Sequence, residues 1–271
     1  MSISPPKSVE PVLLRDDRGG IATLTLNRVP QRNSLSEALM AGLADELSLI
    51  ETDADVRAVV IAANGPVFSA GHDLKEMTVH RADADRGRAY YQRVMSQCSA
   101  MMQAIVRLPK PVIARVQGTA TAAGCQLVAS CDLAVAADTV SFATPGVNIG
   151  LFCSTPMVAL SRNVGRKHAM EMLLTGEMID ALRAVEIGLI NKAVPPEELD
   201  VAVTHFAETI VSKSALTVSI GKEAFYTQLE KGLSDAYVYA SEVMVMNMLA
   251  RDAEEGISSF IEKRDPKWED R

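Results

Sequence analysis

Three short apolar runs, separated by helical segments, limit the fold more than any other feature of this sequence. They are "RAVVIAA" (57–63), "PVIARV" (111–116) and "DLAVAA" (132–137), and β-branched residues are frequent in them. An apolar run without polar alternation is typical of a strand buried on both faces, as in a parallel sheet. The order strand, helix, strand, helix therefore predicts an α/β core of repeated turns.

The segments before and between these runs extend the pattern. "PVLLRD" and "IATLTLN", separated by the turn "DRGG", predict a hairpin within residues 11–28. The next segment has Ser34 and Glu37 as a possible capping box, and residues 82–107 are expected to form a long helix. In the segment that follows Ser34, the apolar residues Leu39, Leu43, Leu47 and Ile50 recur at helical spacing and indicate an amphipathic helix.

The C-terminal third is expected to be a helical layer. From about residue 154 onward the strand signals fade, except in "NKAVP" (191–195). We therefore divide the chain into a core, 1–195, and a helical region, 196–271. The last helices are apolar on more than one face and carry Met244, Met246 and Met248, which suits packing against a partner and simple core packing equally well.

Composition excludes several classes of function. The 271 residues carry a net charge of −7, with Lys and Arg scattered, so neither nucleic acid nor an anionic membrane is an expected partner. No stretch approaches the roughly 18 apolar residues of a membrane span, and the N-terminus has no apolar targeting segment, which predicts a cytoplasmic location. We expect reduced thiols and no metal site from the four cysteines, Cys98, Cys125, Cys131 and Cys153.

Two stretches place small residues where a strand ends and a helix begins. They are "VFSAGHDLKEM" (67–77) and "TATAAGCQLVASCD" (119–132). Gly and Ala allow a ligand to approach the main chain, and the first N–H groups of a helix have no partner within it. Two such donors converging on one oxygen would form an oxyanion hole. The spacing of the small residues alone favours another explanation over an oxyanion hole, namely close packing of a helix on a sheet.

At these residues the chain resembles the enoyl-CoA hydratase/isomerase (crotonase) superfamily. The similar stretches, in order along the chain, are "LTLNRVPQRNSLS", "VFSAGHDLKEM", "GTATAAGCQLVASCDLAVAA", "MEMLLTGEMIDALRAVEIGLINKAV" and "EGISSFIEKRDPKW". They cover nearly the whole chain. "ATAAGCQLVASCD" with "SFATPGVNIGLFCSTP" is similar to one branch in which the family name does not guarantee hydratase activity.

The resemblance implies a crotonase-type spiral of ββα turns with a C-terminal helical region for trimerisation. An acyl-CoA thioester would bind in a homotrimer or a dimer of trimers, with no cofactor beyond its CoA moiety. The N–H groups of His72 and Ala123 would form the oxyanion hole. Residues implied to lie along the CoA are Ala70, Asp73, Leu74 and Lys75, with Phe260 and Lys263 from a neighbouring subunit. Asp73 with Glu76 also suits a capping box, and both lysines also suit a solvated surface.

The pattern departs from hydratases at the two glutamates that they use as acid and base. Here those positions hold Gln126 and Gly146, and neither can transfer a proton. Three hypotheses stay open: a nominal enoyl-CoA hydratase, a decarboxylase or other lyase that needs no glutamate pair, and a non-catalytic acyl-CoA binding protein. His72 is a better candidate for a side-chain role than Cys153, and a loop histidine that points to solvent is the commoner alternative. Replacement polar groups near the acyl site are Thr144, Asn148, Cys153 and Ser154.

Overall fold

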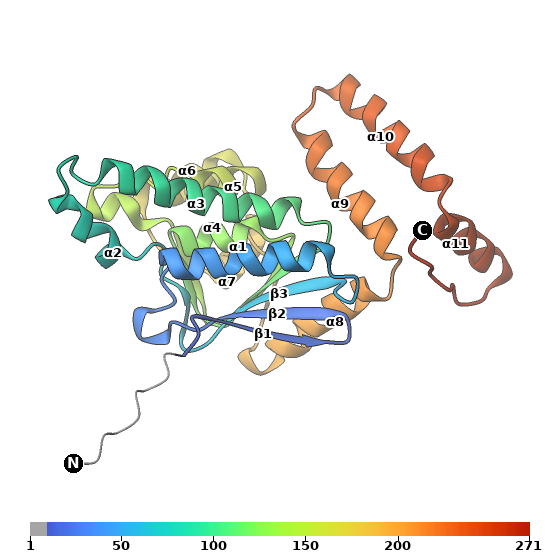
Figure 1. The fold of residues 1–271 in the computed structure, drawn as a ribbon, viewed down its shortest axis with the longest axis horizontal. Coiled ribbons are helices and arrows are strands. Elements are labelled where there is room, and N and C mark those ends of the chain that lie inside the picture. The colour runs from blue at the N-terminus through green and yellow to red at the C-terminus, as the bar shows by residue number, and fades with distance from the viewer. Residues whose placement is uncertain (1–9) are drawn as a thin grey trace, which may run out of the picture.

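The computed structural model describes residues 10–271, which contain two β-sheets. Helices pack around the large sheet (Figure 1). The large sheet has the order β1 (Leu13–Arg18), β2 (Ile21–Leu26), β3 (Ala58–Ala63), β5 (Val112–Val116), β7 (Leu133–Ala137), β10 (Lys192–Val194). The small sheet has the order β4 (Val67–Ser69), β6 (Thr119–Thr121), β8 (Ser141–Ala143), β9 (Ile179–Asp180).

The helices and 3-10 turns connect these strands. The α-helices are α1 (Glu37–Thr52), α2 (Leu74–Val79), α3 (Arg88–Arg107), α4 (Ala123–Ser130), α5 (Pro156–Asn163), α6 (Arg166–Thr175), α7 (Ala181–Glu186), α8 (Leu199–Val211), α9 (Ala215–Leu229), α10 (Leu233–Met248) and α11 (Arg251–Glu262). Short 3-10 turns lie at Val29–Gln31, His80–Ala82, Pro145–Ile149 and Pro196–Glu198. No helix in this part of the chain is long and apolar enough to cross a bilayer.

The large sheet confirms the strands expected from the apolar runs. β1 and β2 form the antiparallel hairpin, and all the other strand pairs of the sheet, from β2–β3 to β7–β10, are parallel. All six residues of β3 are buried, because helices cover both faces of the sheet there. The α/β fold is thus the one expected, including the short strand within "NKAVP".

The helices around the large sheet begin at different residues from those predicted. The cap of α1 is Ser36, whose hydroxyl accepts from Leu39 N at 3.2 Å, so the capping box of Ser34 with Glu37 was wrong. Ser34 instead donates its hydroxyl to Asp73. α3 begins at Arg88 rather than near 82, because the chain first turns through Gly87 at φ 84°.

The small sheet was not recognised as a sheet in the sequence. Its strands have two or three residues each, too few to show a periodicity. β4, β6 and β8 are parallel, so their carboxyl ends meet at one edge. α2 follows β4 and α4 follows β6, as the small residues after each strand led us to expect.

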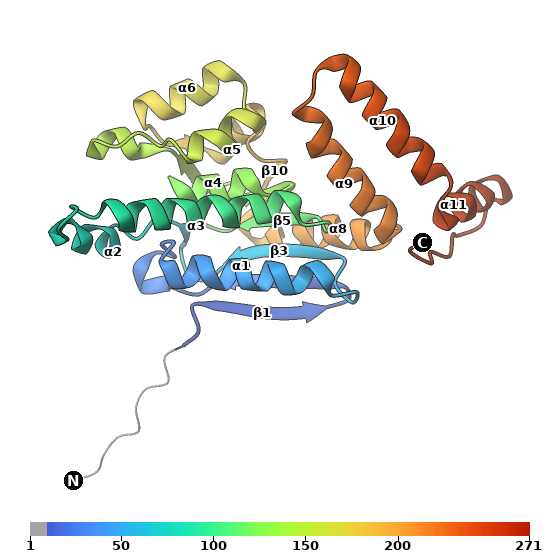
Figure 2. The same cartoon turned by 45° about the horizontal axis from the view of Figure 1, so that its top comes forward.

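The last three helices stand apart from the sheets (Figures 1 and 2). α9 is joined to the core by Lys222, whose Nζ donates to Asp132 Oδ2 at 2.7 Å and to two backbone carbonyls at 3.0 Å. Tyr226 donates its hydroxyl to Asp132 Oδ1 at 2.9 Å. Because Lys222 is buried, this ion pair holds the middle of α9 on the core.

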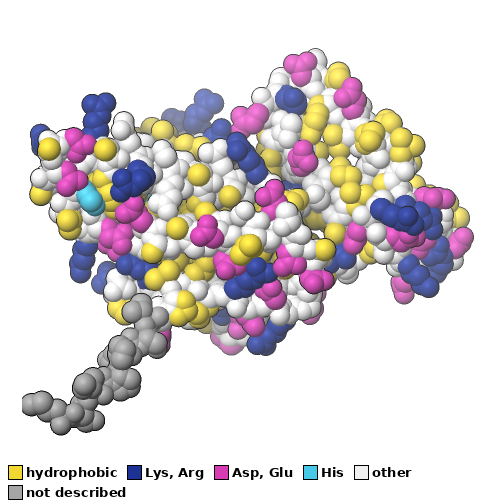
Figure 3. Space-filling model, in the orientation of Figure 1, with side chains coloured by type: hydrophobic (Ala, Val, Ile, Leu, Met, Phe, Trp, Pro, Cys, Tyr) yellow, Lys and Arg dark blue, Asp and Glu magenta, His cyan; other side chains and the backbone are white. Residues whose placement is uncertain are grey.

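α9 and α10 expose a large apolar surface, visible as yellow patches over these helices in Figure 3. It includes Phe225, Leu229, Leu233, Tyr237, Val238, Met244, Val245, Met246, Met248 and Leu249. Exposed apolar areas of this kind mark interaction sites. α8, in contrast, packs on the large sheet, and its Val203 and Ala207 belong to the main core. The division at residues 195/196 stays a prediction.

Candidate active site

The loop between β4 and α2 holds His72 and Asp73. Asp73 caps α2, and its carboxylate accepts from Lys75 N at 3.1 Å and Glu76 N at 3.4 Å. It also accepts from Arg28 Nη2 at 3.0 Å. Asp73 is therefore a helix cap as predicted, but the box is not closed, because the Glu76 carboxylate accepts from Glu37 N instead. The role of Arg28 in holding this loop was not predicted.

The turn between β6 and α4 is strained. Ala122 has φ 51° and ψ −120°, a conformation that side-chain-bearing residues rarely adopt and that costs about 1–3 kcal/mol. Its N–H donates to Ala143 O at 2.9 Å, which fixes the turn to the end of β8. The peptide after Ala122 begins α4, and every residue of α4 is buried.

The two turns lie against each other. A Cβ atom placed on Gly71 would lie 3.1 Å from Ala123 N, and one placed on Gly124 would lie 2.3 Å from Ser69 O. The glycines therefore permit an approach of the two backbones that no larger residue would allow. The packing alternative and the ligand alternative for these small residues are compatible, since the same contact brings the two turns together.

Within residues 10–271, the N–H groups of His72, Ala123 and Gly124 are unengaged donors at this contact. On either side of His72, Leu35 N donates to Gly71 O at 2.7 Å and Asp73 N donates to Leu35 O at 3.2 Å. Within residues 10–271, neither His72 N–H nor Ala123 N–H has a protein acceptor. Ala123 is the first residue of α4, where a free N–H is expected.

Three side chains around these turns have buried polar atoms with no hydrogen-bond partner in the described part of the chain: His72 Nε2, Gln126 Oε1 and Thr144 Oγ1. Gln126 and Thr144 are only 5% and 1% exposed. Burial lowers the pKa of His72 below its ordinary value, so its imidazole is neutral near pH 7. Unsatisfied buried groups are few in native proteins; of those in the described residues, the other three, Arg57 Nε, Gln117 Oε1 and Asn247 Nδ2, belong to other parts of the molecule.

Position 146 has no room for a residue larger than glycine. A Cβ atom there would be 2.8 Å from Leu151 O and 2.9 Å from Cys153 Sγ. The second glutamate of the hydratases therefore has no room while residues 151–153 keep this position. Burial raises the pKa of the Cys153 thiol, so it is no activated nucleophile.

The other residues predicted for the site are more dispersed. Asn148 and Ser154 are exposed, which leaves Thr144 and Cys153 as the buried members of the replacement group. Leu74 and Lys75 are exposed on α2, and Ala70 N donates to Arg32 O at 3.0 Å.

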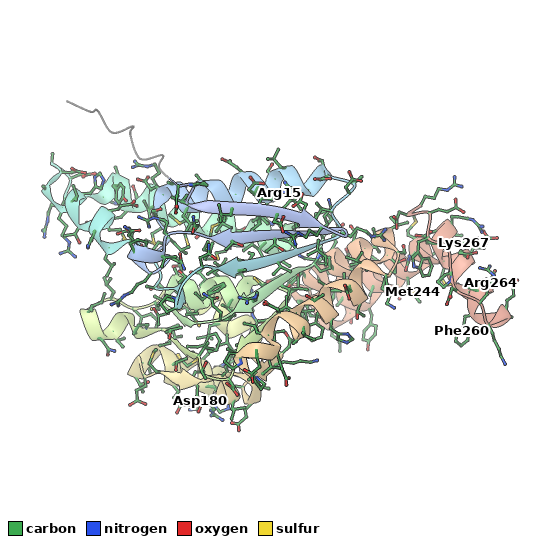
Figure 4. The ribbon with its side chains drawn as sticks, turned by 90° about the horizontal axis from the view of Figure 1, so that it is seen from below. Arg15, Asp180, Met244, Phe260, Arg264 and Lys267 are labelled. Atoms are coloured by element: carbon green, nitrogen blue, oxygen red, sulfur yellow. The ribbon has the colours of Figure 1, made fainter. Side chains whose placement is uncertain are left out.

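Phe260 and Lys263 lie elsewhere, at α11. Phe260 is 85% exposed, at the end of the molecule beyond α10 (Figure 4). Within this single chain, the fold does not bring Phe260 or Lys263 to the turns around His72 and Ala123.

A cavity of about 610 Å³ lies elsewhere, between α8 and the large sheet. Thr23, Thr25, Arg115 and Asp200 are among the residues that line it. None of the predicted site residues does. The chemistry of the molecule is therefore better sought at the two turns, where the fold leaves polar groups without partners, than in this larger space.

Comparison with known proteins identifies the family to which the chain belongs. Residues 16–271 match the family model described as enoyl-CoA hydratase/isomerase, so the chain belongs to this family, the crotonase superfamily. A crystal structure of an enoyl-CoA hydratase from Mycobacterium smegmatis is 52% identical, with a TM-score of 0.91 and coverage of 96% of this chain and 99% of that one.

Within the family, similarity supports the branch indicated by the sequence pattern, that of enoyl-CoA hydratase domain-containing protein 3. The rat mitochondrial protein of that name is 48% identical over 97% of this chain and 86% of its own length. The crystal structure of the human protein of that name is 47% identical, with a TM-score of 0.90 and coverage of 95% of this chain and 100% of that one. The cytoplasmic location predicted above is contradicted by the curated relatives of this branch, which are named as mitochondrial proteins.

Proposed function

We propose that the chain binds an acyl-CoA thioester and polarises its carbonyl between the N–H groups of His72 and Ala123. The observation that carries this proposal is the pair of unengaged donors on two turns in direct contact. The Ala123 N–H also lies at the positive end of the dipole of α4. A fixed donor of this kind is worth about 2.7–4 kcal/mol to an oxyanion that develops during reaction.

The reaction we propose proceeds without the glutamate pair of the hydratases. The chain is nominally an enoyl-CoA hydratase of fatty acid metabolism, but Gln126 cannot act as acid or base and Gly146 has no room for a carboxylate side chain. Chemistry that needs only charge stabilisation at the thioester suits the site better than hydration by acid–base catalysis. The absence of the two glutamates also favours the second candidate, decarboxylation of a malonyl-type acyl-CoA, because departure of CO₂ itself generates the enolate.

We further propose that the site is completed by another copy of the chain, in a homotrimer or a dimer of trimers. Support comes from the apolar surface on α9 and α10, which is larger than a single chain can leave in water without cost. Phe260 and Lys263, exposed on α11, would then close over the CoA of the neighbouring subunit. Gel filtration with light scattering tests the assembly.

The experiment that tests the oxyanion hole removes one donor. Ala123→Pro deletes an N–H at the first position of a helix, where that N–H has no partner within the helix. The matched control is Arg166→Pro at the first position of α6, where the side chain is exposed and belongs to neither the site nor the apolar surface of α9 and α10. Crotonyl-CoA, longer 2-enoyl-CoAs and methylmalonyl-CoA are incubated with each protein, and products are followed by mass spectrometry.

We expect turnover of at least one of these thioesters, reduced about 10²- to 10³-fold by Ala123→Pro and unchanged by the control. Binding of acyl-CoA with no turnover in any assay would establish the non-catalytic alternative. Hydration of crotonyl-CoA by the wild type at the rate of an efficient enzyme would contradict the role that we assign to the missing glutamates.

A further inference from the structure

The turn that carries His72 is tied to the segment before α1 by Arg28, whose side chain is 14% exposed. Its Nη1 donates to Ser34 O at 2.7 Å and to Ser34 Oγ at 3.0 Å, and its Nη2 donates to Asp73 Oδ2 at 3.0 Å. The Ser34 hydroxyl donates to the same Asp73 oxygen at 3.1 Å. One planar guanidinium thus joins two segments that are 39 residues apart in the sequence.

The two segments that Arg28 joins also pair through their backbones. Leu35 and His72 form an isolated parallel bridge. Leu35 N donates to Gly71 O at 2.7 Å, and Asp73 N donates to Leu35 O at 3.2 Å. Gly71 C=O and His72 N–H belong to one trans peptide, so they point in opposite directions. Because Leu35 holds the carbonyl of this peptide, the His72 N–H is directed away from Leu35.

Asp73 is the ionised partner in this arrangement. Burial alone would raise the pKa of its carboxyl, but hydrogen bonds from Arg28, from Ser34 and from the first N–H groups of α2 hold the pKa below its ordinary value. Charge-assisted hydrogen bonds are the strong ones, and the Asp73 side chain is only 10% exposed. Ser34 precedes Leu35 and Asp73 follows His72, so Arg28 holds both sides of the bridge at once.

We infer that Arg28 is a positioning residue for the oxyanion hole: it fixes the bridge between Leu35 and His72 and thereby the direction of the His72 N–H. The turn of Ala123 lies beside this peptide, since a Cβ atom placed on Gly71 would lie 3.1 Å from Ala123 N. The inference rests on the proposed function, because this direction matters only if a thioester carbonyl binds between the two turns. Replacing Arg28 should therefore weaken polarisation of the carbonyl more than binding.

The test measures polarisation directly, with butanoyl-CoA as the probe because it has no double bond to hydrate and no carboxylate to lose. Infrared difference spectra of the bound thioester, with and without carbon-13 at its carbonyl, give the C=O stretching frequency, which falls as the carbonyl is polarised. Kd is measured by calorimetry, and the melting temperature is recorded without ligand. The variants are Arg28→Met, which removes the guanidinium, and Arg28→Lys, whose ammonium is a point charge without the planar fork.

Arg15→Met is the matched control. Arg15 lies on β1 (Figure 4), and its side chain is 22% exposed. It pairs with Asp17, Glu46 and Asp53, none of which belongs to the two turns. The control therefore removes a partly buried guanidinium and its ion pairs away from the site.

In the wild type and in Arg15→Met we expect the same lowered C=O frequency. Arg28→Met should return the frequency toward that of free butanoyl-CoA, while its Kd rises by at most about tenfold, as the loss of one hydrogen bond would give. Arg28→Lys should restore part of the shift, because an ammonium still pairs with Asp73. A merely structural role for Arg28 would lower the melting temperature and leave the frequency of the bound thioester unchanged.

Failure of the inference and failure of the proposed function give different results. A lowered frequency in the wild type that Arg28→Met retains, or that Arg15→Met loses equally, would overturn the role of Arg28 and leave the oxyanion hole in place. An unshifted frequency in the wild type would overturn both. If Arg28→Met does not fold, Arg28→Lys decides: a smaller shift than in the wild type supports the inference, and a full shift overturns it.

Discussion

Replacing Gly124 by alanine tests the contact between the two turns. A Cβ atom at this position would lie 2.3 Å from Ser69 O and 2.8 Å from Ser69 C. Ordinary contact begins near 3.4 Å, so α4 and β4 must separate by about 1 Å. The obstructing atoms belong to the backbone, so no side-chain rotation relieves the clash.

The expected magnitude follows from two opposing effects. Overpacking a tight interior site costs about 1–3 kcal/mol, and replacing glycine within a helix returns about 0.5–1 kcal/mol. We expect Gly124→Ala to lower the free energy of unfolding by roughly 1–2 kcal/mol in denaturant titrations. The rate of turnover should also fall, by about 10²-fold, because moving one donor by 1 Å has an effect of this size in well-oriented sites.

Gly221→Ala is the control for helix propensity. Gly221 lies inside α9, and nothing lies within 4 Å of a Cβ atom placed on it. The free energy of unfolding of this variant should rise by about 0.5–1 kcal/mol, and its turnover should equal that of the wild type. If Gly124→Ala were as stable and as active as Gly221→Ala, the contact between β4 and α4 would not set the geometry of the site, and our reasoning would be refuted.

Three further predictions concern strain, burial of charge and pH. Ala122→Gly should raise the free energy of unfolding by about 1 kcal/mol in denaturant titrations, because relief of strain exceeds the added chain entropy; a loss would contradict the strain. Lys222→Met should lower it by about 3 kcal/mol by leaving the half-buried Asp132 carboxylate without its cationic partner, and an unchanged denaturation midpoint would refute this. Because the pKa of His72 is lower in the folded state, its contribution to stability is complete above about pH 6.5 and is lost as the pH falls below it. Titration of stability against pH with and without His72→Gln should show a flatter curve for the variant, and identical curves would exclude His72 as the source.

The sequence predicted the large sheet well because its strands are long enough to show an uninterrupted apolar pattern. β3 and β5 lie within the runs from which they were predicted, and Leu39, Leu43, Leu47 and Ile50 are all buried on α1. The start of α1 was misassigned because Ser34 and Ser36 are both good capping residues. Only the tertiary contact of Ser34 with Asp73 decides between them.

The geometry of the candidate site was less accessible from the sequence. The strained conformation of Ala122 could not be foreseen, since alanine gives no signal for a positive φ. The obstruction at Gly146 comes from Leu151 and Cys153, which fold back over it through a turn at Gly150. The resemblance identified which positions had changed, but the structure was needed to see that one of them has no room for a side chain.

The most direct test of the central claim is a crystal structure of the protein with a bound acyl-CoA. The account predicts the thioester oxygen about 2.7–3.1 Å from the backbone nitrogens of both His72 and Ala123. A thioester bound with its oxygen turned away from these two groups, or an acyl-CoA seated in the cavity under α8, would contradict it.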